Sequence, residues 1–137
     1  MHMDETIIDF GFNAGKVWTT LNIKGSLNEE SLVQCTKLDP DELSIAIGWL
    51  ARENKIRKDD VAFQLGTTNL TVKIGKDAGK VWKVLHIWED IDPLSIATLA
   101  RINEQDVYAA LGWLSRENKV QTTMMNTTNK QVLFRLK

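Results

Sequence analysis

Residues able to do chemistry are few and widely spaced in this 137-residue chain. It holds two histidines and one cysteine, and no set of them has the spacing of a zinc site. Segments 11–16 and 75–80 superficially resemble a phosphate-binding loop. Their glycines are one residue too close, however, and valine follows the lysine where Ser or Thr is needed. We therefore predict no enzyme activity, no metal, no cofactor and no small-molecule substrate.

Side chains suited to nucleic-acid contact gather in the second half of the chain. Residues 1–70 carry 7 basic and 11 acidic side chains, whereas residues 71–137 carry 10 basic and 7 acidic ones. Lys and Arg neutralise phosphates, while Gln and Tyr can reach base edges. The predicted contacts are Gln105, Tyr108, Arg116, Lys119, Lys130 and Arg135, with Lys80 and Lys83 as further phosphate contacts. The alternative is that the basic end of the chain is an ordinary solvated sheet edge.

Acidic residues oppose this interpretation. The chain has a net charge of −1, and Asp41, Glu42, Glu104 and Asp106 lie where a DNA-reading helix would meet phosphates. Glu42 and Asp106 have another explanation, because an acid at the third helical position complements the helix N-terminus. The near-zero net charge argues against two equivalent DNA-binding domains, but it does not exclude a polyanion partner for the basic second half.

Two tryptophans give a second candidate surface. Helical spacing places Ile45 and Trp49 away from the apolar stripe of their own helix, and Trp113 repeats Trp49. An exposed Ile–Trp pair would be a protein interface, where tryptophan is enriched. Packing within the core or between repeats is the favoured interpretation, and contact with an external protein or with DNA stays open. We predict Ile45, Trp49 and Trp113 as interface residues.

An internal duplication organises these residues. Residues 11–56 match residues 75–120 at 17 of 46 positions with no gap, including AGKVW at 14–18 and 78–82. The motif GWL-x-RENK likewise recurs at 48–55 and 112–119. This predicts one domain over 1–65 and another over 66–137, joined by a β-hairpin near 66–69. A unit of this size buries little surface alone, so we expect the two to pack together.

The same order of elements is predicted in both repeats. A strand (7–10; 70–74) precedes a helix capped by Asn13 or Asp77, and a short helix follows (29–36; 93–101), with Cys35 buried. The third helix begins at a cap, Asp39 or Asn103, and has an apolar stripe. The stripe residues are Leu43, Ala46, Ile47 and Leu50, matched by Val107, Ala110, Leu111 and Leu114. Two-stranded wings close each repeat (56–58 with 61–65; 120–123 with 131–136).

This order is that of a winged helix-turn-helix. Residues 92–101, followed by 107–120, resemble the helix-turn-helix of bacterial winged-helix regulators. The AGKVW and GWL-x-RENK blocks resemble a small, functionally uncharacterised bacterial winged-helix family, here duplicated in tandem. The resemblance implies an α+β, predominantly helical fold, with two tandem winged helix-turn-helix domains packed as a pseudo-dimer. It implies nucleic-acid binding only weakly, because this fold also serves as a protein-docking module.

Two hypotheses of function follow. The first is a non-enzymatic regulator that binds double-stranded DNA through its second repeat. The second is a protein-interaction module in which acidic third helices and tryptophan faces are the interfaces, with a partner protein or a second copy of the chain bound. No apolar run is long enough for a membrane span, and one cysteine without a secretory signal at residues 1–5 predicts a cytoplasmic location.

Overall fold

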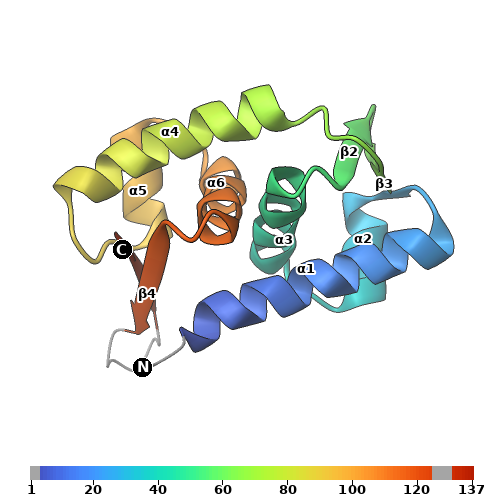
Figure 1. Cartoon of the computed structure of the whole chain (residues 1–137), viewed down its shortest axis with the longest axis horizontal. Coiled ribbons are helices and arrows are strands. Elements are labelled where there is room, and N and C mark those ends of the chain that lie inside the picture. The colour runs from blue at the N-terminus through green and yellow to red at the C-terminus, as the bar shows by residue number, and fades with distance from the viewer. Residues whose placement is uncertain (1–3, 125–130) are drawn as a thin grey trace.

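The computed structural model describes residues 4–124 and 131–137. Two repeats of three helices and a small sheet lie side by side, with the third helices α3 and α6 at the centre (Figure 1). The first repeat comprises α1 (Glu5–Lys24), β1 (Leu27–Asn28), α2 (Glu29–Thr36), α3 (Pro40–Arg52), β2 (Ile56–Asp59) and β3 (Ala62–Leu65). The second comprises α4 (Thr71–Ile87), α5 (Pro93–Ala100), α6 (Glu104–Arg116), β4 (Val120–Met124) and β5 (Val132–Leu136).

The first helix of each repeat is longer than predicted. The strands expected at 7–10 and 70–74 are wrong, and so are the caps at Asn13 and Asp77, because α1 and α4 already run through these residues. Asp4 caps α1 by accepting hydrogen bonds from the backbone N–H of Thr6 at 3.1 Å and of Ile7 at 3.2 Å. Phe10 then extends the buried helical stripe by one turn toward the N-terminus.

The junction between the repeats is a loop and not a hairpin. After β3 the chain passes directly into α4, so the hairpin predicted near 66–69 is wrong. Asn69 holds this loop along the first wing, because its amide accepts from Lys58 N at 2.9 Å and donates to Lys58 O at 2.7 Å. The side chain of Asn54 accepts from Thr68 N at 2.9 Å. Side-chain hydrogen bonds to the wing backbone replace the strand pairing that the sequence suggested.

The third helices form as the sequence predicts. Asp39 accepts from Glu42 N at 2.8 Å, and the carboxyl group of Glu42 accepts from Asp39 N at 3.0 Å, which completes the capping box. Asn103 caps α6 by accepting from Asp106 N at 2.7 Å. All eight residues of the two predicted apolar stripes are buried.

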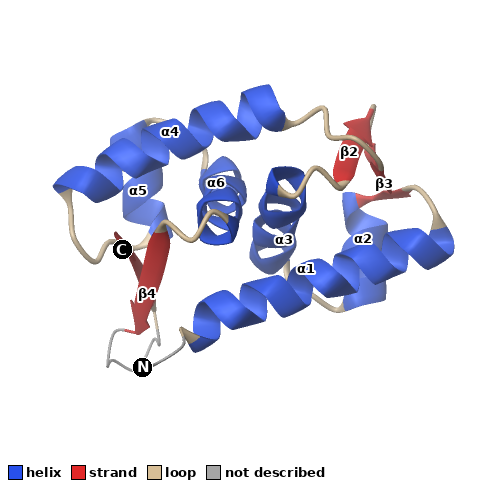
Figure 2. Ribbon diagram, in the orientation of Figure 1, coloured by secondary structure: helices blue, strands red, loops and turns tan. Residues whose placement is uncertain are grey.

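Both predicted wings are present as antiparallel strand pairs at opposite ends of the molecule (Figure 2). In the first sheet, β3 lies between β1 and β2, whereas β4 and β5 form a two-stranded sheet. Cys35 is exposed, so its predicted burial is wrong. Among the described residues, no helix combines the length and apolar character that a bilayer crossing requires.

The repeats exchange core residues. Phe10 of α1 lies in the hydrophobic core of the second repeat, where its ring stacks on Phe134 with centroids 6.1 Å apart. Ile74 of α4 lies reciprocally in the core of the first repeat. The Asp4 carboxylate also bonds Thr122 of β4, at 2.6 Å to the backbone N and 2.7 Å to the hydroxyl. Each first helix therefore completes the other repeat, as in an intertwined dimer.

Candidate functional site

The third helices pack against each other, and this is the most extensive contact between two elements of the molecule. Glycine makes the close approach possible. A Cβ atom on Gly48 would overlap the backbone carbonyl of Ala109, and one on Gly112 would overlap that of Ile45. The helix face that enters the major groove in a DNA-reading winged helix is therefore turned inward, in both repeats.

The two predicted base-contacting residues have partners inside the molecule. The side-chain amide of Gln105 donates to the Glu29 carboxylate of the first repeat at 2.7 Å. The Tyr108 hydroxyl lies 3.4 Å from a carboxylate oxygen of Glu104, to which it donates. Both hydrogen bonds lie at the surface, so each polar group has an intramolecular partner while it stays in contact with solvent.

Ion pairs link the C-terminal ends of the third helices. Arg116 pairs with Glu53 at 3.0 Å, and Arg52 pairs with Glu117 at 3.1 Å, so the two bridges are reciprocal. Lys119 also lies 3.4 Å from Glu117. Two of the predicted phosphate contacts, Arg116 and Lys119, thus face carboxylates of the third-helix ends.

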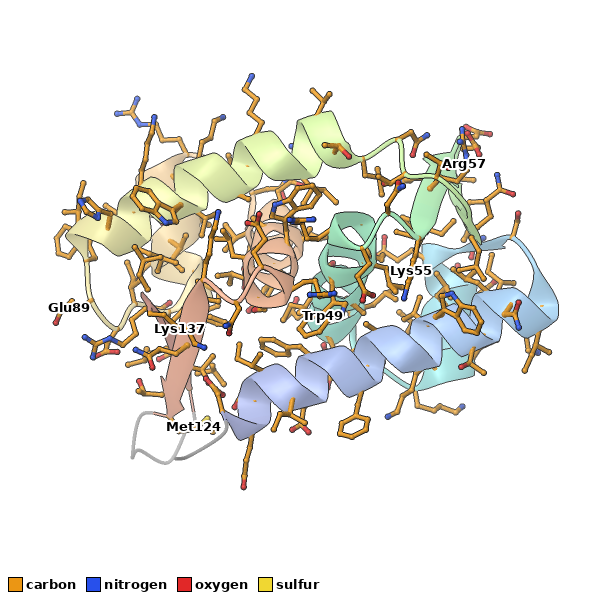
Figure 3. All side chains as sticks on the ribbon, viewed as in Figure 1. Trp49, Lys55, Arg57, Glu89, Met124 and Lys137 are labelled. Atoms are coloured by element: carbon orange, nitrogen blue, oxygen red, sulfur yellow. The ribbon has the colours of Figure 1, made fainter. Side chains whose placement is uncertain are left out.

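The predicted interface residues lie between the repeats. Ile45 is only 5% exposed and packs in the core of the second repeat, so an exposed Ile–Trp patch is wrong for Ile45. Trp49 and Trp113 are half-buried and contact both cores. Figure 3 shows Trp49 between α3 and α1, where its ring lies against Gly11. The side opposite each repeat's own core is covered by the other repeat.

The second wing offers less free positive charge than the sequence suggests. Arg135 lies 3.7 Å from Glu89 and 3.6 Å from Asp90, so its guanidinium faces two carboxylates of the loop after α4. Lys130, another predicted phosphate contact, lies outside the described residues.

An open groove of about 500 Å³, here called the junction groove, lies where the two repeats meet. It is bounded by α1, the N-terminal ends of α3, α5 and α6, and β5. Its apolar lining residues are the exposed Leu94, the half-buried Val132 and the buried Phe10, Ile45, Pro93 and Phe134. Its acidic rim comes from Asp9, Asp39, Asp41, Glu42, Asp92 and Glu104, and no Lys or Arg is among the described residues that line it. The groove is thus apolar with a rim of one sign of charge.

The titrating groups of the junction groove reflect this excess of negative charge. Burial, and then the carboxylates of Asp41 and Glu104, raise the pKa of the Tyr108 hydroxyl, which stays protonated as a donor. Asp41 is an exposed residue. Its pKa is nevertheless raised, first by partial loss of water from its carboxyl group and then by the neighbouring carboxylates of Asp39 and Glu104. A cation in the groove would lower the free energy of the ionised carboxylates.

A second groove, here called the sister groove, lies at the position related to the first by the duplication. Its volume is about 240 Å³, and Lys73, Ile74, Asn103, Gln105, Asp106 and Phe63 are among its lining residues. At the repeat offset of 64, Lys73 corresponds to Asp9, Ile74 to Phe10 and Asp106 to Glu42. The same surfaces thus build both grooves, but a lysine stands in one where an aspartate stands in the other.

A model of one protein family, described as "Winged helix-turn-helix domain (DUF2582)", matches the chain twice, over residues 3–63 and 69–136. The chain belongs to this family. The tandem winged-helix resemblance predicted from the AGKVW and GWL-x-RENK blocks is confirmed, together with the α+β, mainly helical fold. Searches of curated proteins and of solved structures return no match.

For this winged-helix chain, sequence reasoning missed the junction groove. The sequence predicts a strand over Asp9 and Phe10, which gives no sign that these two residues lie between the repeats. One signal was available, because aligning the repeats sets the acidic Asp9 against the basic Lys73. A change of charge sign at matched positions of a duplicated chain marks a site where the two copies differ in chemistry.

Proposed function

We propose that this winged-helix chain is a non-enzymatic protein-docking module, and that a partner docks in the junction groove. The inward packing of α3 and α6 carries the proposal, because it removes from both repeats the helix face that reads bases. The duplication puts a groove at the junction instead. Its volume and its mixture of apolar surface and a few polar groups match those of binding sites.

Selection of displayed random peptides against the intact chain tests this function. Enriched peptides should compete for one site and shift the amide NMR signals of groove residues such as Tyr108. Leu94 lines the groove and is 60% exposed, so Leu94→Ser should weaken the peptides without unfolding the chain. Leu99 is 45% exposed on the same helix but does not line the groove, and Leu99→Ser is the matched control. Equal effects of the two substitutions would contradict docking in the groove.

A DNA titration separates this function from sequence-specific reading. Labelled duplexes of different sequence should bind weakly or not at all at low salt, with the same affinity for each sequence. Sequence-dependent binding that Gln105→Ala abolishes in a folded variant would show that α6 reads DNA, and the docking proposal would fail.

A second candidate function has its own observation. Lys76, Lys80 and Lys83 lie at helical spacing on one exposed face of α4, and none of them forms an ion pair with a described residue. The matched positions of α1 hold Phe12, Lys16 and Thr19, so this basic face belongs to the second repeat alone. Contact of these lysines with phosphates would bind duplex DNA without reading its sequence.

Salt dependence tests the second candidate. Three phosphate contacts predict that log K falls with log salt concentration at a slope of roughly −3. Replacing Lys76 and Lys83 by glutamate should abolish this binding, whereas Lys16→Glu on α1 should leave it nearly unchanged. A slope that is independent of these lysines would contradict the assignment.

A further inference from the structure

We infer that the partner segment held by the junction groove is basic, with lysine or arginine side chains against the carboxylate rim and apolar side chains over Leu94 and Val132. This inference rests on the proposed docking function and names the chemistry of its partner. Three observations carry it: the charge of the rim, the apolar surface below it, and the way in which the sister groove is filled.

The rim supplies charge complementarity for a cation. Six carboxylate side chains line the groove, and none of them forms an ion pair with a residue that the structure describes. Three of the six, Asp39, Glu42 and Asp92, are also committed to backbone N–H groups at helix N-termini. Asp9, Asp41 and Glu104 form no such cap. A surface rimmed by one sign of charge attracts the opposite sign and rejects like charge.

The apolar surface favours a peptide over a small free cation. The exposed Leu94 and the half-buried Val132 supply the accessible apolar surface of the groove, and the stacked rings of Phe10 and Phe134 are buried beneath it. Within the parts of the chain that the structure describes, no cluster of His, Cys, Asp and Glu could hold a metal ion, so the carboxylates are spread along the groove. Dispersed charge over an apolar surface matches a segment that alternates basic and apolar side chains.

The sister groove shows how a lysine occupies this geometry. The Lys73 ammonium lies 2.7 Å from Asp77 and 2.9 Å from Asp106, which corresponds to Glu42 of the junction groove. The hydrogen bonds to Asp77 and Asp106 raise the pKa of Lys73. The sister groove also has about half the volume of the junction groove. In the junction groove Asp9 takes the place of this lysine, so the chain supplies a cation to one groove and leaves the other to a partner.

The experiment titrates three probes against the intact, isotope-labelled chain: a short peptide of alternating lysine and leucine, the same peptide with glutamate in place of lysine, and the polyamine spermine. The lysine peptide should shift the amide signals of Asp41 and Tyr108, and the glutamate peptide should not. Spermine should bind more weakly than the lysine peptide, because it has no side chains to place on the apolar surface.

Asp9→Lys is the decisive variant, since it copies the arrangement of the sister groove. It should weaken binding of the lysine peptide by about tenfold or more, the loss of at least one charge-assisted hydrogen bond. Glu30 is exposed and does not line the groove. Glu30→Lys makes the same change in net charge and should alter the affinity by about twofold or less, because salt screens an exposed distant charge. Should Asp9→Lys fail to fold, Asp41→Asn combined with Glu104→Gln removes rim charge with little change in shape.

The reciprocal substitution adds a gain of function. Lys73→Asp should replace the ammonium of the sister groove by a carboxylate, with Lys58 left as the cation among its described lining residues, and raise the number of bound lysine peptides per chain above one. The inference is overturned if either the glutamate peptide or spermine binds as tightly as the lysine peptide. It is also overturned if both Asp9→Lys and the double variant leave the affinity for the lysine peptide unchanged. It is also overturned if sedimentation shows that the chain self-associates and Asp9→Lys abolishes this, because the occupant would then be a second copy.

Failure of this inference differs from failure of the docking function. Displayed peptides that bind in the junction groove but are neutral or acidic would leave the docking function in place and overturn only the basic chemistry. Sequence-specific DNA binding through Gln105, with no peptide bound in the groove, would overturn both.

Discussion

The contact between α3 and α6 predicts opposite effects for alanine at buried and at exposed glycines. Glycine in a helix interior costs about 0.5–1 kcal/mol relative to alanine. Gly15 and Gly79 lie in the interiors of α1 and α4, and a Cβ atom there would meet nothing within 4 Å. Gly15→Ala and Gly79→Ala should therefore each raise the free energy of unfolding by about that amount.

At Gly48 and Gly112 the structure predicts a large loss instead. The added Cβ would overlap a backbone carbonyl of the facing helix, which cannot rotate away as a side chain would. The helices must separate, and overpacking of this kind costs about 1–3 kcal/mol or more, which outweighs the gain in helix propensity. We expect a net loss on the order of 2 kcal/mol for Gly48→Ala and for Gly112→Ala.

Thermal unfolding followed by circular dichroism measures both effects. For a chain of this length, 1 kcal/mol corresponds to a shift in Tm of roughly 3–5 °C. Gly15→Ala should raise Tm by a few degrees, and Gly48→Ala should lower it by roughly 6–10 °C. If Gly48→Ala were as stable as Gly15→Ala, the third helices would not pack as described, and their outer faces would again be available to DNA.

Three further predictions concern the repeat junction. Phe10→Ala should lower the free energy of unfolding, measured by chemical denaturation, by about 3–5 kcal/mol, because the ring packs on Phe134. Amide hydrogen exchange in β5 of the other repeat should become faster. Unchanged hydrogen exchange in β5 would contradict the packing of Phe10 in the second repeat's core. A double-mutant cycle on Arg116 and Glu53 should give a coupling of about 1 kcal/mol or less, since the arginine is 47% exposed, and a much larger value would mean a drier interface. The raised pKa of Asp41 means that ionisation of its carboxyl group opposes folding. Lowering the pH from neutral, through the folded-state pKa toward the unfolded value, should therefore remove this destabilisation relative to the Asp41→Asn variant. Binding of the lysine peptide, measured by calorimetric titration, should weaken over the same pH range.

Local sequence signals determined the parts of the fold that depend on neighbouring residues. The capping residues Asp39 and Asn103, the apolar stripes of the third helices and both wings were predicted, because hydrogen bonds within one turn and a buried stripe each have a fixed period in the sequence. The duplication and the winged-helix fold followed from the same signals, since both repeats share the motifs.

Structural features that depend on contacts with the other repeat could not be predicted from a short stretch of sequence. A short apolar run such as residues 7–10 has no distinct period, so the sequence predicts a strand there. Only the core of the second repeat shows that Phe10 continues a helical stripe. The Ile45 side chain lies away from its own core, so its burial required knowledge of what covers that side.

The sequence alone therefore determined two winged helices and the opposite charges of their halves. The tertiary structure decided which faces are free. Close glycine contacts place α3 and α6 face to face, which turns the expected DNA-reading surface into an internal interface and creates the junction groove beside it. The physical reason is that a helix face is a property of the sequence, whereas its solvent exposure depends on what packs against it, here a second copy of the same fold.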